Sequence, residues 1–104
     1  MKLKLIKGTH GQYAFYCPAC KDIHCVWTDP RDCVHVWGWN KNKDKPTFTP
    51  SIKVLSYTGQ KVTGICHSFI KDGKIQYLGD CTHKMKGKTV ELPDIPKKHL
   101  NFLK

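Results

Sequence analysis

The sequence predicts a small all-β or β-rich domain in which a zinc-ribbon-like knuckle is carried on antiparallel hairpins. First, its apolar residues fall in short runs with almost no helical periodicity. Second, turn residues such as Gly8, Gly11 and Thr58-Gly59-Gln60 separate these runs. Third, Cys17 and Cys20 have the spacing of a metal-binding turn. With 104 residues, residues 1–104 form one domain whose modest core a bound metal would stabilise.

The expected strands follow from β-branched and aromatic residues between turn signals. They cover residues 2–7, 13–17, 23–28, 34–40, 52–57, 62–70, 75–78 and 89–91. The turn Lys71-Asp72-Gly73-Lys74 predicts a hairpin, because Asp-Gly readily adopts the positive φ angles of a two-residue turn. Residues 46–51 contain two prolines, which cannot donate to a full strand ladder, so we expect a fixed extended loop that presents Ser51. Residues 92–103 predict a short terminal helix, beginning near Pro96, or a loop packed over the sheet.

Cys17-Pro18-Ala19-Cys20 indicates a metal knuckle, and His24 and Cys25 follow it closely. Two thiolates three residues apart on a tight turn can both reach a tetrahedral Zn²⁺ ion. A redox pair is the alternative, but such pairs lie at a helix N-terminus. Residues 23–28 are β-branched and aromatic instead. We therefore expect the knuckle at the tip of a β-hairpin.

Alternation along residues 62–70 separates neighbouring side chains. Cys66 and Ser68 should lie on one face of this strand, with His67 and Phe69 on the other. Cys66 and His67 are therefore not expected to bind the same ion. We predict a structural Zn²⁺ site with ligands Cys17, Cys20, His24 and Cys66. Cys25 in place of His24 is the alternative, because consecutive residues on a strand point apart.

The remaining polar residues have hydrolase character, because a serine nucleophile needs an imidazole base that a carboxylate orients. The candidate catalytic residues are Ser51, His67, Ser68, Asp80 and His83. In a second hypothesis, His67, Asp80 and His83 bind a catalytic metal that activates water. In a third, the histidines make backbone hydrogen bonds and the serines cap turns.

The charge and the cysteines limit the other function classes. The formal net charge is +10, which suits nucleic acid or an acidic protein partner. However, Arg31 is the only arginine, and base and phosphate recognition relies heavily on arginine. A solvated lysine surface is therefore favoured over a nucleic-acid groove. Six cysteines could form three disulfides in an exported protein, but the first residues have no continuous apolar run, so we expect reduced thiols in the cytoplasm and no membrane association.

Several ordered motifs resemble a family of small phage and prophage proteins, itself similar to the BubE component of bacterial ubiquitin-like operons. These are Phe15-Tyr16-Cys17-Pro18-Ala19-Cys20 with His24, Trp37-Gly38-Trp39-Asn40, Lys45-Pro46-Thr47-Phe48-Thr49-Pro50-Ser51, Cys66-His67-Ser68-Phe69-Ile70, Asp72-Gly73, Asp80-Cys81-Thr82-His83 and Gly87-Lys88-Thr89-Val90-Glu91-Leu92-Pro93.

The resemblance implies a zinc-binding, peptidase-like domain that processes or deconjugates ubiquitin-like tails in a bacterial or phage-infected cell. It places Cys17, Cys20 and His24 in the metal knuckle, and Ser51, Cys66, His67, Ser68, Asp80 and His83 in the functional core. The chain departs from the family pattern at Lys88 and adds Cys25, Cys33 and Cys81.

Two function classes follow. The first is a small zinc-binding hydrolase, a serine-type peptidase that acts on proteins or ubiquitin-like tails. The second is a non-catalytic zinc-ribbon-like module that binds nucleic acid or an acidic protein. Trp37 and Trp39, expected on one strand face, could line a substrate groove or pack in the core.

Overall fold

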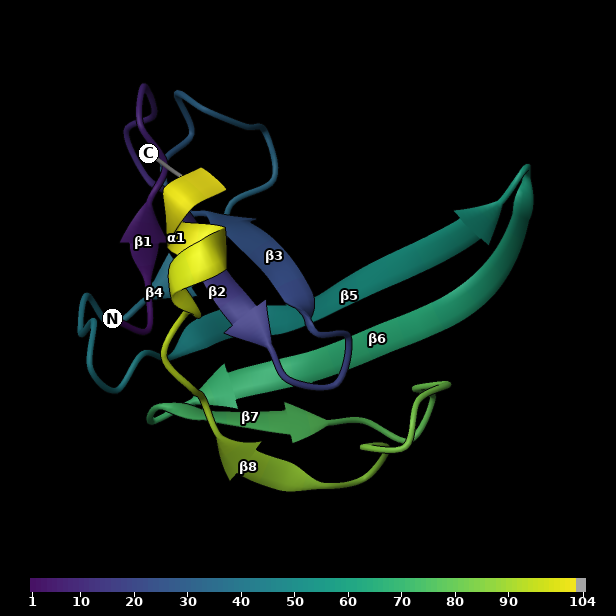
Figure 1. Cartoon of the computed structure of the whole chain (residues 1–104). Coiled ribbons are helices and arrows are strands. Elements are labelled where there is room, and N and C mark those ends of the chain that lie inside the picture. The colour runs from purple at the N-terminus through teal and green to yellow at the C-terminus, as the bar shows by residue number, and fades with distance from the viewer. Residues whose placement is uncertain (103–104) are drawn as a thin grey trace.

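The computed structural model describes residues 1–102, which form two antiparallel sheets and one short helix (Figure 1). The first sheet has the order β1-β2-β3 and the second β4-β5-β6-β7-β8. Their strands are β1 (Lys4–Leu5), β2 (Gln12–Cys17), β3 (Asp22–Trp27), β4 (Gly38–Trp39), β5 (Phe48–Thr58), β6 (Lys61–Lys71), β7 (Lys74–Tyr77) and β8 (Thr89–Glu91), and the helix is α1 (Lys97–Phe102). The β-rich prediction is therefore confirmed.

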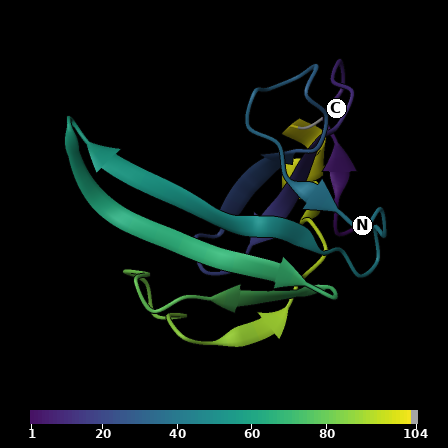
Figure 2. The ribbon, with the colours of Figure 1, turned by 180° about the vertical axis from the view of Figure 1, so that it is seen from behind.

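Strands β5 and β6 form a long hairpin whose tip extends away from the rest of the chain (Figures 1 and 2). We call the part of this hairpin from residue 53 to residue 65 the arm. At its tip, Gly59 has a φ of 62°, a left-handed conformation that glycine adopts without steric cost. The base of the hairpin continues into the body of the second sheet, so the arm is anchored at one end only.

The turn after β6 is the two-residue hairpin that Asp-Gly predicts. Lys71 pairs with Lys74, and the two turn residues have φ angles of 50° for Asp72 and 78° for Gly73. A side chain at Gly73 would also approach within 3.0 Å of the Lys45 backbone. Both the conformation and the space therefore favour glycine at this position.

Three predicted segments differ from the structure. The strand expected at 2–7 is shortened to β1, Lys4–Leu5. The strand expected at 34–40 is reduced to β4. The residues before β4 form a loop in which Val34 is 91% exposed, and the Trp37 N–H donates to the Trp27 carbonyl of the first sheet. The loop expected at 46–51 is partly wrong, because β5 already begins at Phe48. Its register against β6 shifts between Phe48 and Ile52, so the strand bulges around the cis Thr49-Pro50 bond.

The terminal segment forms a helix, α1, that lies beside the first sheet (Figure 1). The Tyr16 and His99 rings are 5.3 Å apart at this contact. Leu103, part of the predicted tail, lies outside the described residues. Among residues 1–102, no helix is long and apolar enough to span a membrane.

The core lies between the two sheets and determines which faces remain free. Phe15 and Val26 from the first sheet pack in one cluster with Phe48, Ile70 and Tyr77 from the second. Along β6 the alternate residues Cys66, Ser68 and Ile70 are buried, whereas His67 and Phe69 lie on the opposite face. One face of this strand therefore contributes to the core, and the other is available for a surface site.

Candidate active site and metal centre

Three polar side chains, from β5, β6 and the segment after β7, form a chain of hydrogen bonds. The Ser51 Oγ lies 2.8 Å from His67 Nε2. On the other side of the ring, His67 Nδ1 lies 3.0 and 3.1 Å from the two carboxylate oxygens of Asp80. In this arrangement Nδ1–H donates to Asp80 and Nε2 accepts the hydroxyl proton, which is the arrangement of a serine, histidine and aspartate triad.

The bulge in β5 and the hairpin of β6 and β7 bring these residues together. β5 contributes Ser51 within the register shift, and bulges of this kind redirect side chains near active sites. Asp80 follows β7 in a segment held against β6 by two contacts to the His67 backbone. The Leu78 N–H donates to the His67 carbonyl at 2.9 Å, and the buried Cys81 sulfur lies 3.2 Å from the His67 nitrogen. The backbone on both sides of Asp80 is therefore fixed relative to His67.

The triad lies at the surface and its charges favour an ionised Asp80. The side chains of His67 and Asp80 are 22% and 42% exposed. Partial burial disfavours the charged carboxylate, but the hydrogen bond from His67 and the nearby charges of His67 and Lys53 outweigh it and hold the pKa of Asp80 below its ordinary value. Lys53 Nζ lies 3.8 Å from the Asp80 carboxylate. Asp80 can therefore orient His67 as an anion.

The structure places the other two candidate catalytic residues elsewhere. Ser68 is only 1% exposed and faces the core. The His83 and Tyr77 rings make an edge-type contact with their centroids 4.8 Å apart. The His83 Nδ1 accepts a hydrogen bond from the Met85 N–H. Within residues 1–102, no metal-suited cluster joins His83 to His67 and Asp80. The geometry therefore does not favour the hypothesis of a water-activating metal at these three residues.

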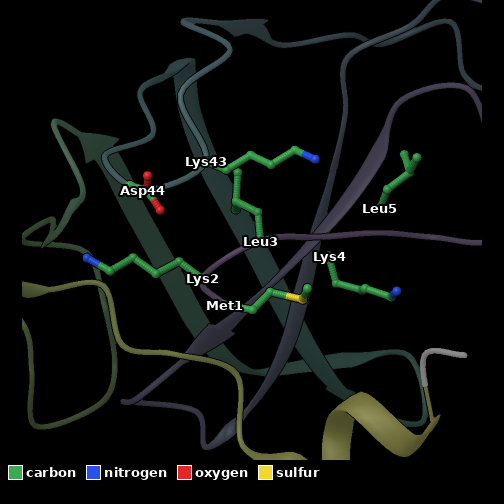
Figure 3. A pocket seen from close by; sticks show the side chains of 7 residues that line it. All are labelled: Met1, Lys2, Leu3, Lys4, Leu5, Lys43 and Asp44. Atoms are coloured by element: carbon green, nitrogen blue, oxygen red, sulfur yellow. The ribbon is translucent and has the colours of Figure 1, made fainter.

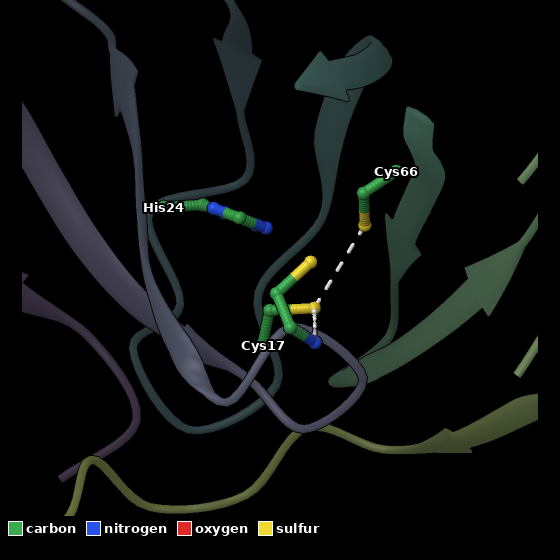
Figure 4. Close-up of side chains that lie close together, drawn as sticks. Cys17, His24 and Cys66 are labelled. Atoms are coloured by element: carbon green, nitrogen blue, oxygen red, sulfur yellow. Dashed lines mark hydrogen bonds between the residues drawn. The ribbon is translucent and has the colours of Figure 1, made fainter. Parts of the chain in front are cut away.

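A second group of side chains, on the core side of β6, could hold a metal ion. The donor atoms of Cys17, Cys20, His24 and Cys66 all lie within 4.8 Å of one another. The Cys17 and Cys66 sulfurs are 3.8 Å apart, which matches the edge of about 3.8 Å in a tetrahedron with Zn–S bonds of about 2.3 Å. Figure 4 shows His24 and the two cysteines directed into one space. Cys25 is not part of this group.

Hydrogen-bond contacts from neighbouring groups position these donor atoms. His24 Nδ1 lies 3.2 Å from the Ile23 carbonyl, while its buried Nε2 has no hydrogen-bond partner among the described residues and is left to coordinate. The Tyr77 hydroxyl lies 3.2 Å from the Cys17 sulfur and accepts from the Ala19 N–H at 3.3 Å. The Cys20 N–H also donates to the Cys17 sulfur, at 3.4 Å. These contacts fix the knuckle around the donor atoms.

The three thiols favour a bound cation electrostatically. The hydrogen bond from Cys66 is the main cause that lowers the pKa of Cys17, to about 3. Burial then raises the pKa of Cys20 to about 11, and the hydrogen bond with Cys17 raises the pKa of Cys66. Without a cation, deprotonation of one thiol hinders that of the others. A divalent cation supplies the charge that allows all three to act as thiolates.

Three contributors to these sites were missed by the sequence analysis. Lys53 lies two residues after Ser51 on β5, a spacing that places both on one face. Cys81 was noted only as an extra thiol. Tyr77 pairs with Ser68 in the hairpin. Because Ser68 was expected on the same face as the ligand Cys66, this pairing could have indicated that Tyr77 points toward the metal centre.

Comparison with known proteins identifies a family. The family model described as "Bacterial ubiquitination-like system serine protease (BubE)" matches residues 2–78. No curated protein and no solved structure matches the chain. The matched segment includes Ser51, His67 and the four residues of the metal cluster, whereas Asp80 lies just beyond it. Since the match covers more than half of the 104 residues, the chain belongs to the BubE family of bacterial ubiquitination-like system serine proteases.

Proposed function

We propose that this protein is a serine-type peptidase in which Ser51 is the nucleophile, His67 the general base and Asp80 the residue that orients His67. The hydrogen-bond chain of 2.8 Å and 3.0 Å through the two nitrogens of His67 is the observation that supports this. The family membership supports the same class of activity.

The proposed reaction follows from the positions of the protons. Ser51 Oγ attacks the scissile carbonyl while His67 Nε2 takes the hydroxyl proton. The tetrahedral intermediate then expels the amine, which receives that proton from His67 and leaves an ester on Ser51. Water, deprotonated by His67, hydrolyses this ester and restores the serine. Throughout, the Asp80 carboxylate stabilises the positive charge that His67 acquires.

We propose Zn²⁺ as the ion of the metal centre, with a structural role. Three cysteine sulfurs and one histidine nitrogen are the donor set of closed structural zinc sites. Four protein ligands leave no open position for a water nucleophile. Such an ion would connect the knuckle between β2 and β3 to Cys66 of β6, and hence to the strand that carries His67.

We propose a folded protein substrate with an exposed tail, such as a ubiquitin-like protein, because the arm has an apolar face beside the triad. Lys53 is opposite His67 in the register, and Leu55 and Tyr57 follow on the same face of β5. Leu55 is 37% exposed, Tyr57 58% and the facing Val62 43%. Apolar residues exposed together on a protruding hairpin are typical of a protein interaction surface.

Labelling with a fluorophosphonate probe, followed by peptide mass spectrometry, tests the nucleophile. Ser51→Ala should abolish the adduct and reduce cleavage of a tailed ubiquitin-like substrate by about four orders of magnitude or more. Ser68→Ala is the matched control and should retain both, because Ser68 lies in the core. Each variant's metal content should equal that of the wild type. An adduct on Ser68, or undiminished cleavage by Ser51→Ala, would refute the assignment.

A further inference from the structure

We propose that the cavity between residues 34–37 and Pro50 is a subsite for an aliphatic side chain of the peptide substrate next to the scissile bond. This inference rests on the proposed peptidase function and adds the class of substrate residue that the site prefers. It depends on the position, the lining and the attachment of the cavity.

The cavity adjoins the proposed nucleophile. It has a volume of about 400 Å³ and is lined by Val34, His35, Val36, Trp37 and Pro50. Pro50 directly precedes Ser51 in the chain. The indole N–H of Trp37 donates to the Ser51 carbonyl at 3.3 Å. The wall of the cavity is therefore tied to the backbone of the residue that would attack the substrate.

The lining is apolar and accessible. Val34 is 91% exposed and Val36 is 42% exposed. Neither residue lies in a strand, and neither packs in the core. The loop that carries them is anchored at its two ends. The Asp32 carboxylate accepts hydrogen bonds from the Gly11 N–H at 2.7 Å and the His10 N–H at 3.1 Å, and the Trp37 N–H donates to the Trp27 carbonyl. Anchored exposed valines beside a nucleophile suit ligand binding.

In three other cavities, no lining residue is a direct chain neighbour of Ser51. The cavity in Figure 3, about 330 Å³ in volume, is lined by residues 1–5 together with Lys43 and Asp44, so lysines contribute to its wall. The cavity beside Trp39 contains Asp29 and Lys41 in its lining. The cavity at Pro50, by contrast, has no lysine, aspartate or glutamate in its lining, and His35 is its single titratable residue.

The chemistry of the lining indicates the preferred side chain. Valine methyl groups, a proline ring and an indole gain free energy by covering aliphatic carbon. Apart from His35, the lining offers no titratable group to a charged side chain, whose burial would be unfavourable. We therefore expect leucine or valine in this subsite, with glycine and aspartate disfavoured.

The experiment uses two readouts, so that the subsite and the peptidase activity can fail separately. Blocked peptides that differ only in the residue before the scissile bond, leucine or glycine, are compared in kcat/KM with the wild type. The same peptides are titrated by NMR against Ser51→Ala, which reports binding without cleavage. Val36→Trp is designed to fill the cavity. Leu5→Trp is the matched control, because Leu5 is 39% exposed and belongs to the first sheet.

We expect leucine to be preferred over glycine by about 10- to 100-fold in both readouts. Val36→Trp should remove this preference, whereas Leu5→Trp should keep both the preference and the fluorophosphonate labelling of Ser51. Equal binding and cleavage of the two peptides, or no binding of either, would overturn the subsite. A leucine preference in binding without labelling or cleavage would support the subsite and refute the peptidase proposal.

Discussion

Substitution of Tyr77 by phenylalanine tests how the interior of the fold supports the metal centre. Tyr77 is 1% exposed, and its hydroxyl makes two contacts, one to the Cys17 sulfur at 3.2 Å and one to the Ala19 N–H at 3.3 Å. Phenylalanine keeps the ring and removes only the oxygen. Any effect on the metal therefore comes from these two contacts.

The expected magnitude follows from the partner left behind. Loss of the acceptor leaves the partly buried Ala19 N–H unsatisfied at a cost of about 1–3 kcal/mol. If this cost falls on the metal-bound state, the Kd for Zn²⁺ should rise by about 5- to 150-fold. This agrees with the loss of about 10- to 100-fold that removal of outer-shell partners causes.

Competition against a chromogenic chelator measures this Kd directly. Tyr57→Phe is the matched control, because Tyr57 lies on the arm and is 58% exposed. It should bind Zn²⁺ as the wild type does. A Kd for Tyr77→Phe within twofold of the wild-type value would refute the reasoning, because the hydroxyl would then contribute nothing to the centre.

Three further predictions concern the triad, the metal and the anchored loop. Asp80→Asn should lower kcat by about 10⁴-fold with metal content unchanged; a loss of less than tenfold, measured with a peptide substrate, would exclude Asp80 from the orienting role. Cys66→Ser should release Zn²⁺ and abolish cleavage. In the wild-type protein, replacement of Zn²⁺ by Cd²⁺ should preserve the fold and leave kcat nearly unchanged. A kcat that varied with the identity of the metal would instead indicate metal-activated water. Hydrogen bonds from the His10 and Gly11 N–H groups lower the pKa of Asp32, so its ionised form stabilises the fold above the ordinary pKa and this contribution disappears as the pH falls through the lowered value. Chemical denaturation should show Asp32→Asn to be less stable than the wild type at pH 7, and the difference should shrink as the pH falls below the ordinary carboxyl pKa; a difference that did not depend on pH would contradict this.

The fold was predictable where local rules act alone. The Asp72-Gly73 turn requires positive φ angles that only a few residues adopt, and it fixes the pairing of β6 with β7. Residues 34–37 alternate in a way that is typical of a strand, but within residues 1–102 no neighbouring strand pairs with them. An alternating segment becomes a strand only if another strand pairs with it. The local sequence does not specify which distant segment will do so.

The bulge in β5 is a strand that forms although its local sequence predicts an interruption. Pro50 correctly indicates an interrupted ladder, because it lacks an N–H group. The strand nevertheless continues through it, since β4 pairs with Thr49 on the opposite edge and the register shift absorbs the interruption. Local chemistry therefore predicts the defect, and tertiary contacts decide that the strand survives it.

The candidate sites differ in how far sequence could resolve them. The knuckle ligands are close in sequence, so their spacing alone brings three donor atoms together, and alternation on β6 adds Cys66. The same alternation places Ser68 beside Cys66 on the buried face, but the sequence analysis left the choice between Ser51 and Ser68 open, and the structure is needed to pair Ser51 with His67. Selection of Asp80, by contrast, requires the distance from His67, because that depends on the path of the chain after β7.

The consecutive residues Cys66 and His67 explain why one small domain can hold both sites. Neighbours on a strand point to opposite faces, so the cysteine reaches the metal centre through the core and the histidine reaches Ser51 at the surface. The metal would then act on catalysis through the position of the β6 backbone and not through contact with the substrate. Because a triad loses activity when its groups move by about 1 Å, release of the metal should abolish cleavage although no metal ligand takes part in the chemistry.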